Sequence, residues 1–134
     1  MLRGGCFCGQ VRYEADGQAY NETICHCTDC RRAAGAASVA WFAVKRAGLR
    51  WTGAEPASFR SSARAIRRFC GACGTSLTWE GREQPDEVDL STATLDDPAQ
   101  APPKDHVFAA SAVGWDKICD GLPAYPGRRT HALG

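Results

Sequence analysis

Seven of the eight cysteines in this sequence fall into three tight groups, and their spacing is the strongest chemical signal in the chain. The groups lie at residues 6–8, 25–30 and 70–73. Thiolates are strong ligands for zinc, which takes four ligands in a tetrahedron. Two cysteines separated by one or two residues allow both sulfurs to reach one ion. The spacing therefore predicts metal binding rather than a disulfide framework.

The first and third groups each supply two thiols, and two thiols cannot complete a tetrahedron. We therefore predict that the two pairs combine into one closed structural zinc site. Its ligands would be Cys6, Cys8, Cys70 and Cys73. Gly9, Gly71 and Gly74 are expected to supply the positive-φ or close-approach positions of the tight turns. The competing interpretation is that these are ordinary free thiols.

The middle group supplies three thiols within six residues. Cys25 and Cys27 would share one face of an extended segment, and Cys30 follows after the chain bends. Three protein ligands and one open position are typical of catalytic rather than structural zinc. His26 lies between two of the ligands, so strand alternation directs it away from their metal.

Two other interpretations of the middle group stay open. His106 or Cys119 could supply a fourth ligand and close a second structural site. Three sulfurs could also belong to an iron–sulfur cluster, although the spacing differs from the common ferredoxin patterns. Cys119, the eighth cysteine, has no other assignment.

Two arginine pairs adjoin the cysteines: Arg31 and Arg32 follow the middle group, and Arg67 and Arg68 precede the third. Such charges usually form a solvated face. Beside thiolates, however, guanidinium groups can offset negative charge or bind a substrate carboxylate in a bidentate manner. Arg31 is the favoured substrate-binding residue because it emerges beside the open site.

The elements that position these residues are predicted to be mainly strands. Apolar and polar residues alternate over 10–15, and segment 38–44 is apolar on both faces, as a central buried strand requires. Weaker strand patterns occupy residues 49–52, 66–69, 76–79, 88–92 and 106–109.

Helix signals are scarce. One short turn is predicted over 31–34, with Thr28 or Asp29 as its cap and Gly35 at its end. The proline-rich segment 96–103 predicts a loop.

The length of 134 residues predicts one domain over residues 1–134, with an irregular tail over about 121–134. Sixteen Lys and Arg residues against fifteen Asp and Glu residues give a net charge of +1, so no strong attraction to nucleic acid or acidic membranes is expected. No signal peptide is evident, and the longest apolar stretch, 33–44, is too short to span a membrane. A cytoplasmic location is expected.

The cysteine motifs and their neighbours closely resemble the glutathione-dependent formaldehyde-activating enzyme family, whose relatives include the domain of centromere protein V. The resemblance lies in segments 5–13, 25–35, 68–77, 106–108, 115–116 and 120–123. It implies a zinc-stabilised β-tent of bent antiparallel sheets with little helix. It also implies two Zn²⁺ per chain, one on the four outer cysteines and one on the middle three.

In the enzyme that names this family, the thiol of glutathione adds to formaldehyde and gives S-hydroxymethylglutathione, a carbon–sulfur lyase activity. The expected function is thus a zinc-dependent carbon–sulfur lyase or synthase acting on a small thiol and a small aldehyde. Cys25, Cys27 and Cys30 would form the catalytic zinc centre. Arg31 or Arg32 would hold a substrate carboxylate, and His26 or His106 would shuttle a proton.

Two alternatives compete with this function. One is a non-enzymatic double-zinc module that binds a partner, which a protein ligand at the fourth position of the middle site would favour. The other is a B-type methionine sulfoxide reductase, which needs a separate redox cysteine for which Cys119 is the only candidate.

Overall fold

The structure is a computed structural model that describes residues 1–129, so the last five residues of the predicted tail lie outside it. Its strands are β1 (Leu2–Gly5), β2 (Arg12–Ala15), β3 (Tyr20–Cys25), β4 (Val39–Lys45), β5 (Leu49–Trp51), β6 (Ala57–Ser62), β7 (Ala65–Phe69), β8 (Ser76–Gly81), β9 (Glu87–Ser91) and β10 (His106–Val107). The helix α1 covers Thr28–Ala34, and 3-10 turns occupy Arg46–Gly48, Thr92–Thr94, Pro98–Gln100 and Ala109–Ser111. The prediction of a mainly β fold with little helix is confirmed.

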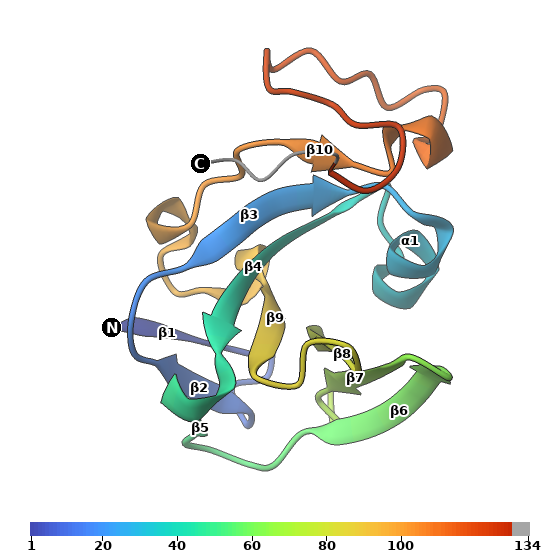
Figure 1. The fold of residues 1–134 in the computed structure, drawn as a ribbon. Helices are drawn as coiled ribbons and strands as arrows, with labels where there is room; N and C mark the ends of the chain where they lie inside the picture. The colour runs from blue at the N-terminus through green and yellow to red at the C-terminus, as the bar shows by residue number, and fades with distance from the viewer. Residues whose placement is uncertain (130–134) are drawn as a thin grey trace.

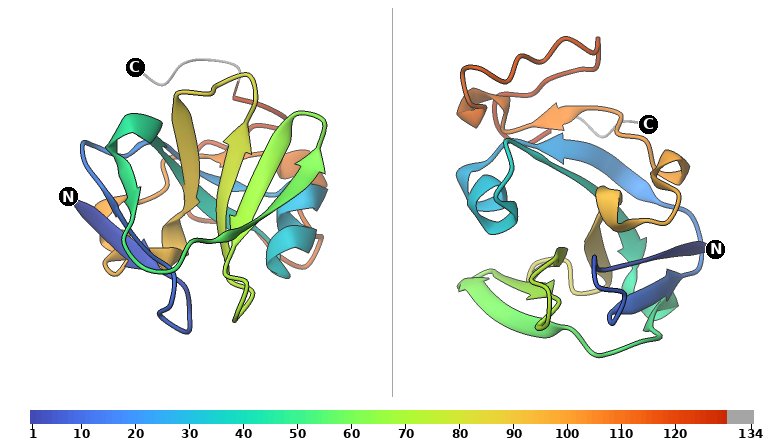
Figure 2. Two further views of the ribbon diagram at one scale, coloured as in Figure 1. Left: turned by 90° about the horizontal axis from the view of Figure 1, so that it is seen from below. Right: turned by 180° about the vertical axis from the view of Figure 1, so that it is seen from behind.

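The strands form two sheets. A small sheet has the order β1-β2-β5, and a large sheet has the order β10-β3-β4-β9-β8-β7-β6. Neighbouring strands are antiparallel except β10 and β3, which are parallel. The large sheet is strongly bent, and α1 lies on the side of the molecule away from the N-terminal strands (Figures 1 and 2).

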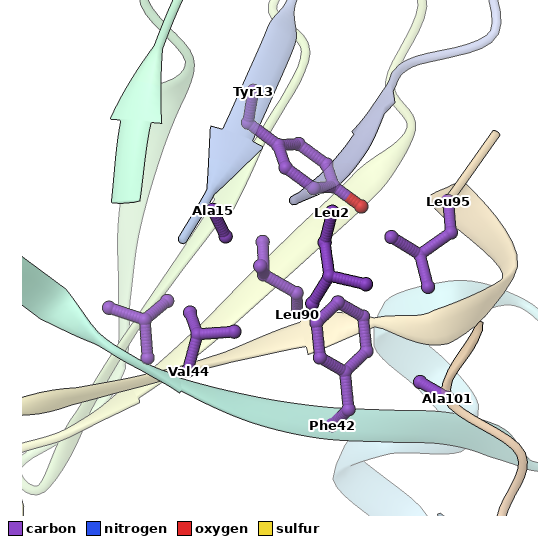
Figure 3. Packing of buried hydrophobic residues seen from close by; sticks show 9 residues of the cluster. Leu2, Tyr13, Ala15, Phe42, Val44, Leu90, Leu95 and Ala101 are labelled. Carbon is purple, nitrogen blue, oxygen red and sulfur yellow. The ribbon is translucent and has the colours of Figure 1, made fainter. Parts of the chain in front are cut away.

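The main hydrophobic core lies between the two sheets (Figure 3). On β4, Phe42 and Val44 are fully buried in this core, where they meet residues of β2, β9 and the segment after it. The core cluster consists of Leu2, Tyr13, Ala15, Phe42, Val44, Val88, Leu90, Leu95 and Ala101. Because side chains alternate along a strand, Trp41 and Ala43 must project from the opposite face of the large sheet. This opposite face of the large sheet can therefore carry a functional site.

The helix α1 begins directly after Cys27, includes Cys30 in its first turn and is only seven residues long. Its N-cap is Cys27, whose sulfur accepts a hydrogen bond from the backbone N–H of Cys30, so the prediction of Thr28 or Asp29 as the cap is wrong. Gly35 ends the helix in the left-handed conformation, with φ of 63°, as expected. Within the described residues, no helix is long and apolar enough to cross a membrane.

Candidate metal centres and the adjoining cavity

Cys6, Cys8, Cys70 and Cys73 are brought together by the turns after β1 and β7, and we call them the four-cysteine cluster. All four sulfurs lie within 4.8 Å of one another. Cys6 Sγ is 3.5 Å from Cys8 Sγ, and Cys8 Sγ is 3.7 Å from Cys70 Sγ. A tetrahedron with zinc–sulfur bonds of ~2.3 Å has sulfurs about 3.8 Å apart. The cluster could therefore hold one metal ion.

The turns that carry these thiols have the geometry of metal knuckles. The backbone N–H of Cys73 donates to Cys70 Sγ at 3.4 Å, which fixes the second pair. Gly9 and Gly74 have φ values of 81° and 82°, where a side chain would be strained, and so perform the role predicted for them. Gly71 does not adopt a positive φ, so that part of the prediction is wrong.

The thiols of this cluster cannot all ionise without a cation. Hydrogen bonds from the Thr75 hydroxyl and backbone lower the pKa of Cys73 to about 5. For Cys8, the backbone N–H of Gln10 favours the thiolate, but burial and the neighbouring thiols outweigh it and raise the pKa to about 12. A bound cation would remove this conflict between neighbouring negative charges.

Cys25, Cys27 and Cys30 form the three-cysteine cluster, again with all sulfurs within 4.8 Å of one another. Cys25 ends β3, Cys27 caps α1 and Cys30 lies in its first turn. Hydrogen bonds from Cys25 and Cys30 lower the pKa of Cys27 to about 2, while the same contacts raise the pKa of Cys25. Three thiols that converge in this way could hold a second metal ion.

The side chain of Arg67 lies against the three-cysteine cluster. It is only 8% exposed, and its Nη2 donates to Cys30 Sγ at 3.6 Å. Its guanidinium carbon lies 6.0 Å from the centroid of the Trp41 ring. Its other terminal nitrogen, Nη1, is buried and has no hydrogen-bond partner within the described residues.

The three cysteines line a cavity of about 440 Å³ on the open face of the large sheet. Trp41, Trp79 and Phe108 form its apolar walls. The four-cysteine cluster contributes none of its residues to this cavity. The two clusters therefore differ in their access to small molecules.

Charged groups surround the rest of the cavity. Glu87 and Asp89 lie on the β9 side, and Arg128 and Arg129 come from the C-terminal segment. Arg129 is paired with Asp105, which is completely buried. Within residues 1–129 the hydrogen bonds and ion pairs include none made by the Arg128 side chain, so its guanidinium can reach a ligand.

The variant Asp89→Asn is expected to be more stable than the parent chain, by a difference that grows as the pH rises. Burial, and then the charge of Glu87, raise the pKa of Asp89 to about 7. The unfolded carboxyl has a pKa of ~3.9, so the folded protein binds more protons between these values and loses stability as pH increases through them. Relative to the parent chain, Asp89→Asn should gain about 2–3 kcal/mol in unfolding free energy from pH 5 to pH 8. Denaturant titration with saturating zinc measures this, and a pH-independent difference would contradict it.

The two predicted histidines lie behind the three-cysteine cluster in a hydrogen-bonded chain. His26 Nε2 is 2.8 Å from His106 Nδ1, and His106 Nε2 is 2.7 Å from Asp120 Oδ2. His26 and His106 are buried, whereas the Asp120 side chain is 43% exposed. Neither histidine joins the sulfurs, and Cys119 is exposed and also separate from them. Within the described residues, nothing closes the three-cysteine cluster with a fourth protein ligand.

Arg31 is half-buried and Arg32 is exposed on the outer side of α1, and neither lines the cavity. Arg31 donates a long hydrogen bond of 3.5 Å to the carbonyl oxygen of Ser111. Arginines at the cavity come instead from β7 and the C-terminal segment. The first turn of α1 places Cys27 and Cys30 at the cavity, so the side chains of the residues directly after Cys30 point away from it.

Comparisons with known proteins agree with this architecture. A family model described as glutathione-dependent formaldehyde-activating enzyme matches residues 1–111. No curated protein matches the chain. The crystal structure of a Rhodobacter sphaeroides protein is 19% identical, with a TM-score of 0.59, and the match covers 92% of this chain and 98% of that one. That likeness supports the same fold.

Proposed function

Because this chain belongs to the glutathione-dependent formaldehyde-activating enzyme family, we propose that it adds a small thiol to a small aldehyde. Glutathione and formaldehyde are the proposed substrates, and the reaction is that of a carbon–sulfur lyase or synthase. Cys25, Cys27 and Cys30 would hold a catalytic zinc ion, and the four-cysteine cluster would hold a structural one.

One observation carries this proposal. Three thiols that could hold a metal line a cavity of about 440 Å³, and no fourth protein ligand is found within the described residues. A ligand set with an open position beside a cavity is typical of catalytic zinc, whereas structural sites are closed. The four-cysteine cluster matches the second description.

The chemistry requires an ionised thiol and a dry site. Zinc held by the three sulfurs would lower the pKa of a thiol that coordinates it, which makes that thiol a nucleophile near neutral pH. Trp41, Trp79 and Phe108 would exclude water from the aldehyde and so limit its hydration. The thiol loses one proton and the aldehyde oxygen gains one, so the addition is neutral overall.

We assign binding of a substrate carboxylate to Arg128. Its side chain lines the cavity, whereas the guanidinium of Arg129 is already engaged by Asp105. Arg31 and Arg32, the residues favoured by the sequence, do not line the cavity. A guanidinium can bind a carboxylate through two parallel hydrogen bonds, which suits the carboxylates of glutathione.

The chain from His26 through His106 to Asp120 would exchange protons with solvent. Each link is a short hydrogen bond, and the Asp120 carboxylate at its end is accessible to water. His26 Nδ1, at the other end, is buried without a partner in the described residues. In the proposed reaction, this chain would carry the proton that the thiol releases toward solvent.

A reducing compartment, such as the cytoplasm, is the proposed location. All eight cysteines are free, and the proposed function requires seven of them as thiolate ligands. Oxidation to disulfides would remove both sites.

Native mass spectrometry tests the proposed function. We expect two zinc ions per chain and one bound glutathione, because the free thiol can occupy the open position. S-Methylglutathione is the matched control, since its sulfur cannot ionise, and it should bind at least about 10-fold more weakly. Equal binding of the two compounds, or a chain without glutathione–formaldehyde turnover, would contradict the proposal.

A further inference from the structure

Arg67 lines the cavity beside the three-cysteine cluster, and the proposed reaction has not yet given it a role. The strand register pairs Arg67 with Trp79, Trp79 with Asp89, and Asp89 with Ala43. Directly paired residues point to the same side of a sheet, so Arg67 projects from the face that carries the cavity. Its neighbour Arg68 projects from the other face and binds Glu80 at 2.7 Å.

The burial of Arg67 lacks the usual compensation. Arginine is almost never buried without a paired carboxylate. Yet none of the ion pairs found in residues 1–129 includes Arg67. Among the described residues, Nη2 has only Cys30 Sγ as an acceptor, and Nη1 has none. A buried donor without an acceptor costs about 1–3 kcal/mol. Because Arg67 also lines the cavity, its unpaired donor points to an acceptor that arrives with a ligand.

The reaction produces such an acceptor. When the thiolate sulfur attacks the aldehyde, a carbon–sulfur bond forms and the π electron pair of the carbonyl moves onto oxygen. That oxygen carries negative charge until it takes up a proton equivalent to the one that the thiol released. A fixed cationic donor within apolar walls stabilises this charge far better than water does, because it needs no reorientation.

We propose that Arg67 is a catalytic residue whose Nη1 N–H donates to the aldehyde oxygen beside Cys30 and stabilises the negative charge that forms there. This inference rests on the proposed function and adds the group that recognises the carbonyl. The competing role, neutralisation of the thiolate charge through Cys30, needs only Nη2 and leaves Nη1 without a purpose.

The test compares thioacetate with ethanethiol as ligands of the zinc-loaded protein. Thioacetate has its oxygen one carbon away from sulfur, as in the adduct, whereas ethanethiol has no oxygen. The ratio of their dissociation constants is measured by calorimetry for the parent chain, Arg67→Gln and Arg67→Lys. Comparing ratios between variants cancels the different acidities of the two thiols. Arg60→Gln, an exposed arginine on the edge strand β6, is the charge-matched control.

We expect Arg67→Gln to weaken thioacetate binding by about 10- to 100-fold and ethanethiol binding by less than about 3-fold. Arg67→Lys keeps the charge but not the forked donor, so it should lose part of the selectivity and hold ethanethiol normally. Arg60→Gln should leave both constants unchanged. Equal losses for both ligands in Arg67→Gln would assign Arg67 to charge neutralisation and overturn the proposal, as would no loss for either.

Zinc content and turnover separate this inference from the proposed function. Each variant is first shown to hold two zinc ions by mass. A parent chain that selects thioacetate through Arg67 but has no thiol–aldehyde turnover would contradict the proposed function alone. A parent chain with turnover that Arg67→Gln fully retains would contradict the role of Arg67 alone.

Discussion

Replacing Cys25 with serine is expected to remove one of the two zinc ions per chain and to reduce thiol–aldehyde turnover by at least about 100-fold, while the chain stays folded. Loss of one of three protein ligands should cost more affinity than the 10- to 100-fold typical of changes around metal ligands. The fold should persist because Cys25 lies outside the main core between the sheets. Mass spectrometry under native conditions and a glutathione–formaldehyde assay provide the measurements.

Cys119→Ser is the matched control for this experiment. Cys119 is an exposed thiol that belongs to neither cluster, so its replacement should preserve zinc content and turnover. Full turnover by Cys25→Ser would eliminate the three-cysteine cluster as the catalytic centre. If that variant lost zinc while the parent chain proved inactive with every thiol, a non-enzymatic double-zinc module would become the better interpretation.

Replacing Cys70 with serine is expected to lower the stability of the folded chain, rather than to act directly on the catalytic step. Cys70 is 1% exposed and packs with Val11 and Leu77, in a cluster that joins the N-terminal segment to residues 70–73. Structural zinc can contribute ~10–16 kcal/mol of binding free energy, which in small domains is folding free energy. Loss of one of four ligands should cost about 4 kcal/mol and lower Tm by about 10–15 °C.

Cys25→Ser serves as the comparison for Cys70→Ser, because each variant removes one thiol from one cluster. Calorimetry should give a large fall in Tm for Cys70→Ser and a much smaller one for Cys25→Ser. An unchanged Tm after Cys70→Ser would refute the structural role of the four-cysteine cluster. Similar falls in Tm for the two variants would show that the four-cysteine cluster is not a structural site distinct from a catalytic three-cysteine cluster.

The strands that the sequence predicts are those with one face in the core. Segments 10–15, 38–44 and 88–92 alternate or are continuously apolar, and each corresponds to a strand. The sequence pattern predicts no strand over residues 2–5, and two of these four residues are glycine, which has a low strand propensity. The edge strand at 57–62 is exposed along most of its length, so nothing in its pattern marks a buried face. Its formation depends on pairing with β7.

The site residues also differ in how far the sequence predicts them. The cysteine ligands can be predicted because ligand spacing within a turn is a local property of the chain. Arg67 is adjacent to Arg68 in sequence, and only strand register shows which of them faces the cavity. Arg128 lies 98 residues beyond Cys30, and it reaches the cavity because the C-terminal segment pairs with β10 through His106 and Phe108. The spacing to Cys70 marks Arg67 only as one member of an arginine pair, and no short-range signal identifies Arg128.

The sequence by itself thus determined three local groups of thiols, because sulfurs one or two residues apart converge wherever the chain turns. The tertiary structure joined the first and third groups into the four-cysteine cluster. Only the tertiary structure decided that the three-cysteine cluster borders a cavity and the four-cysteine cluster does not. It also decided which charged groups surround that cavity. The physical reason is that a bent sheet selects one face of each of several strands, and that choice depends on pairing between residues far apart in the chain.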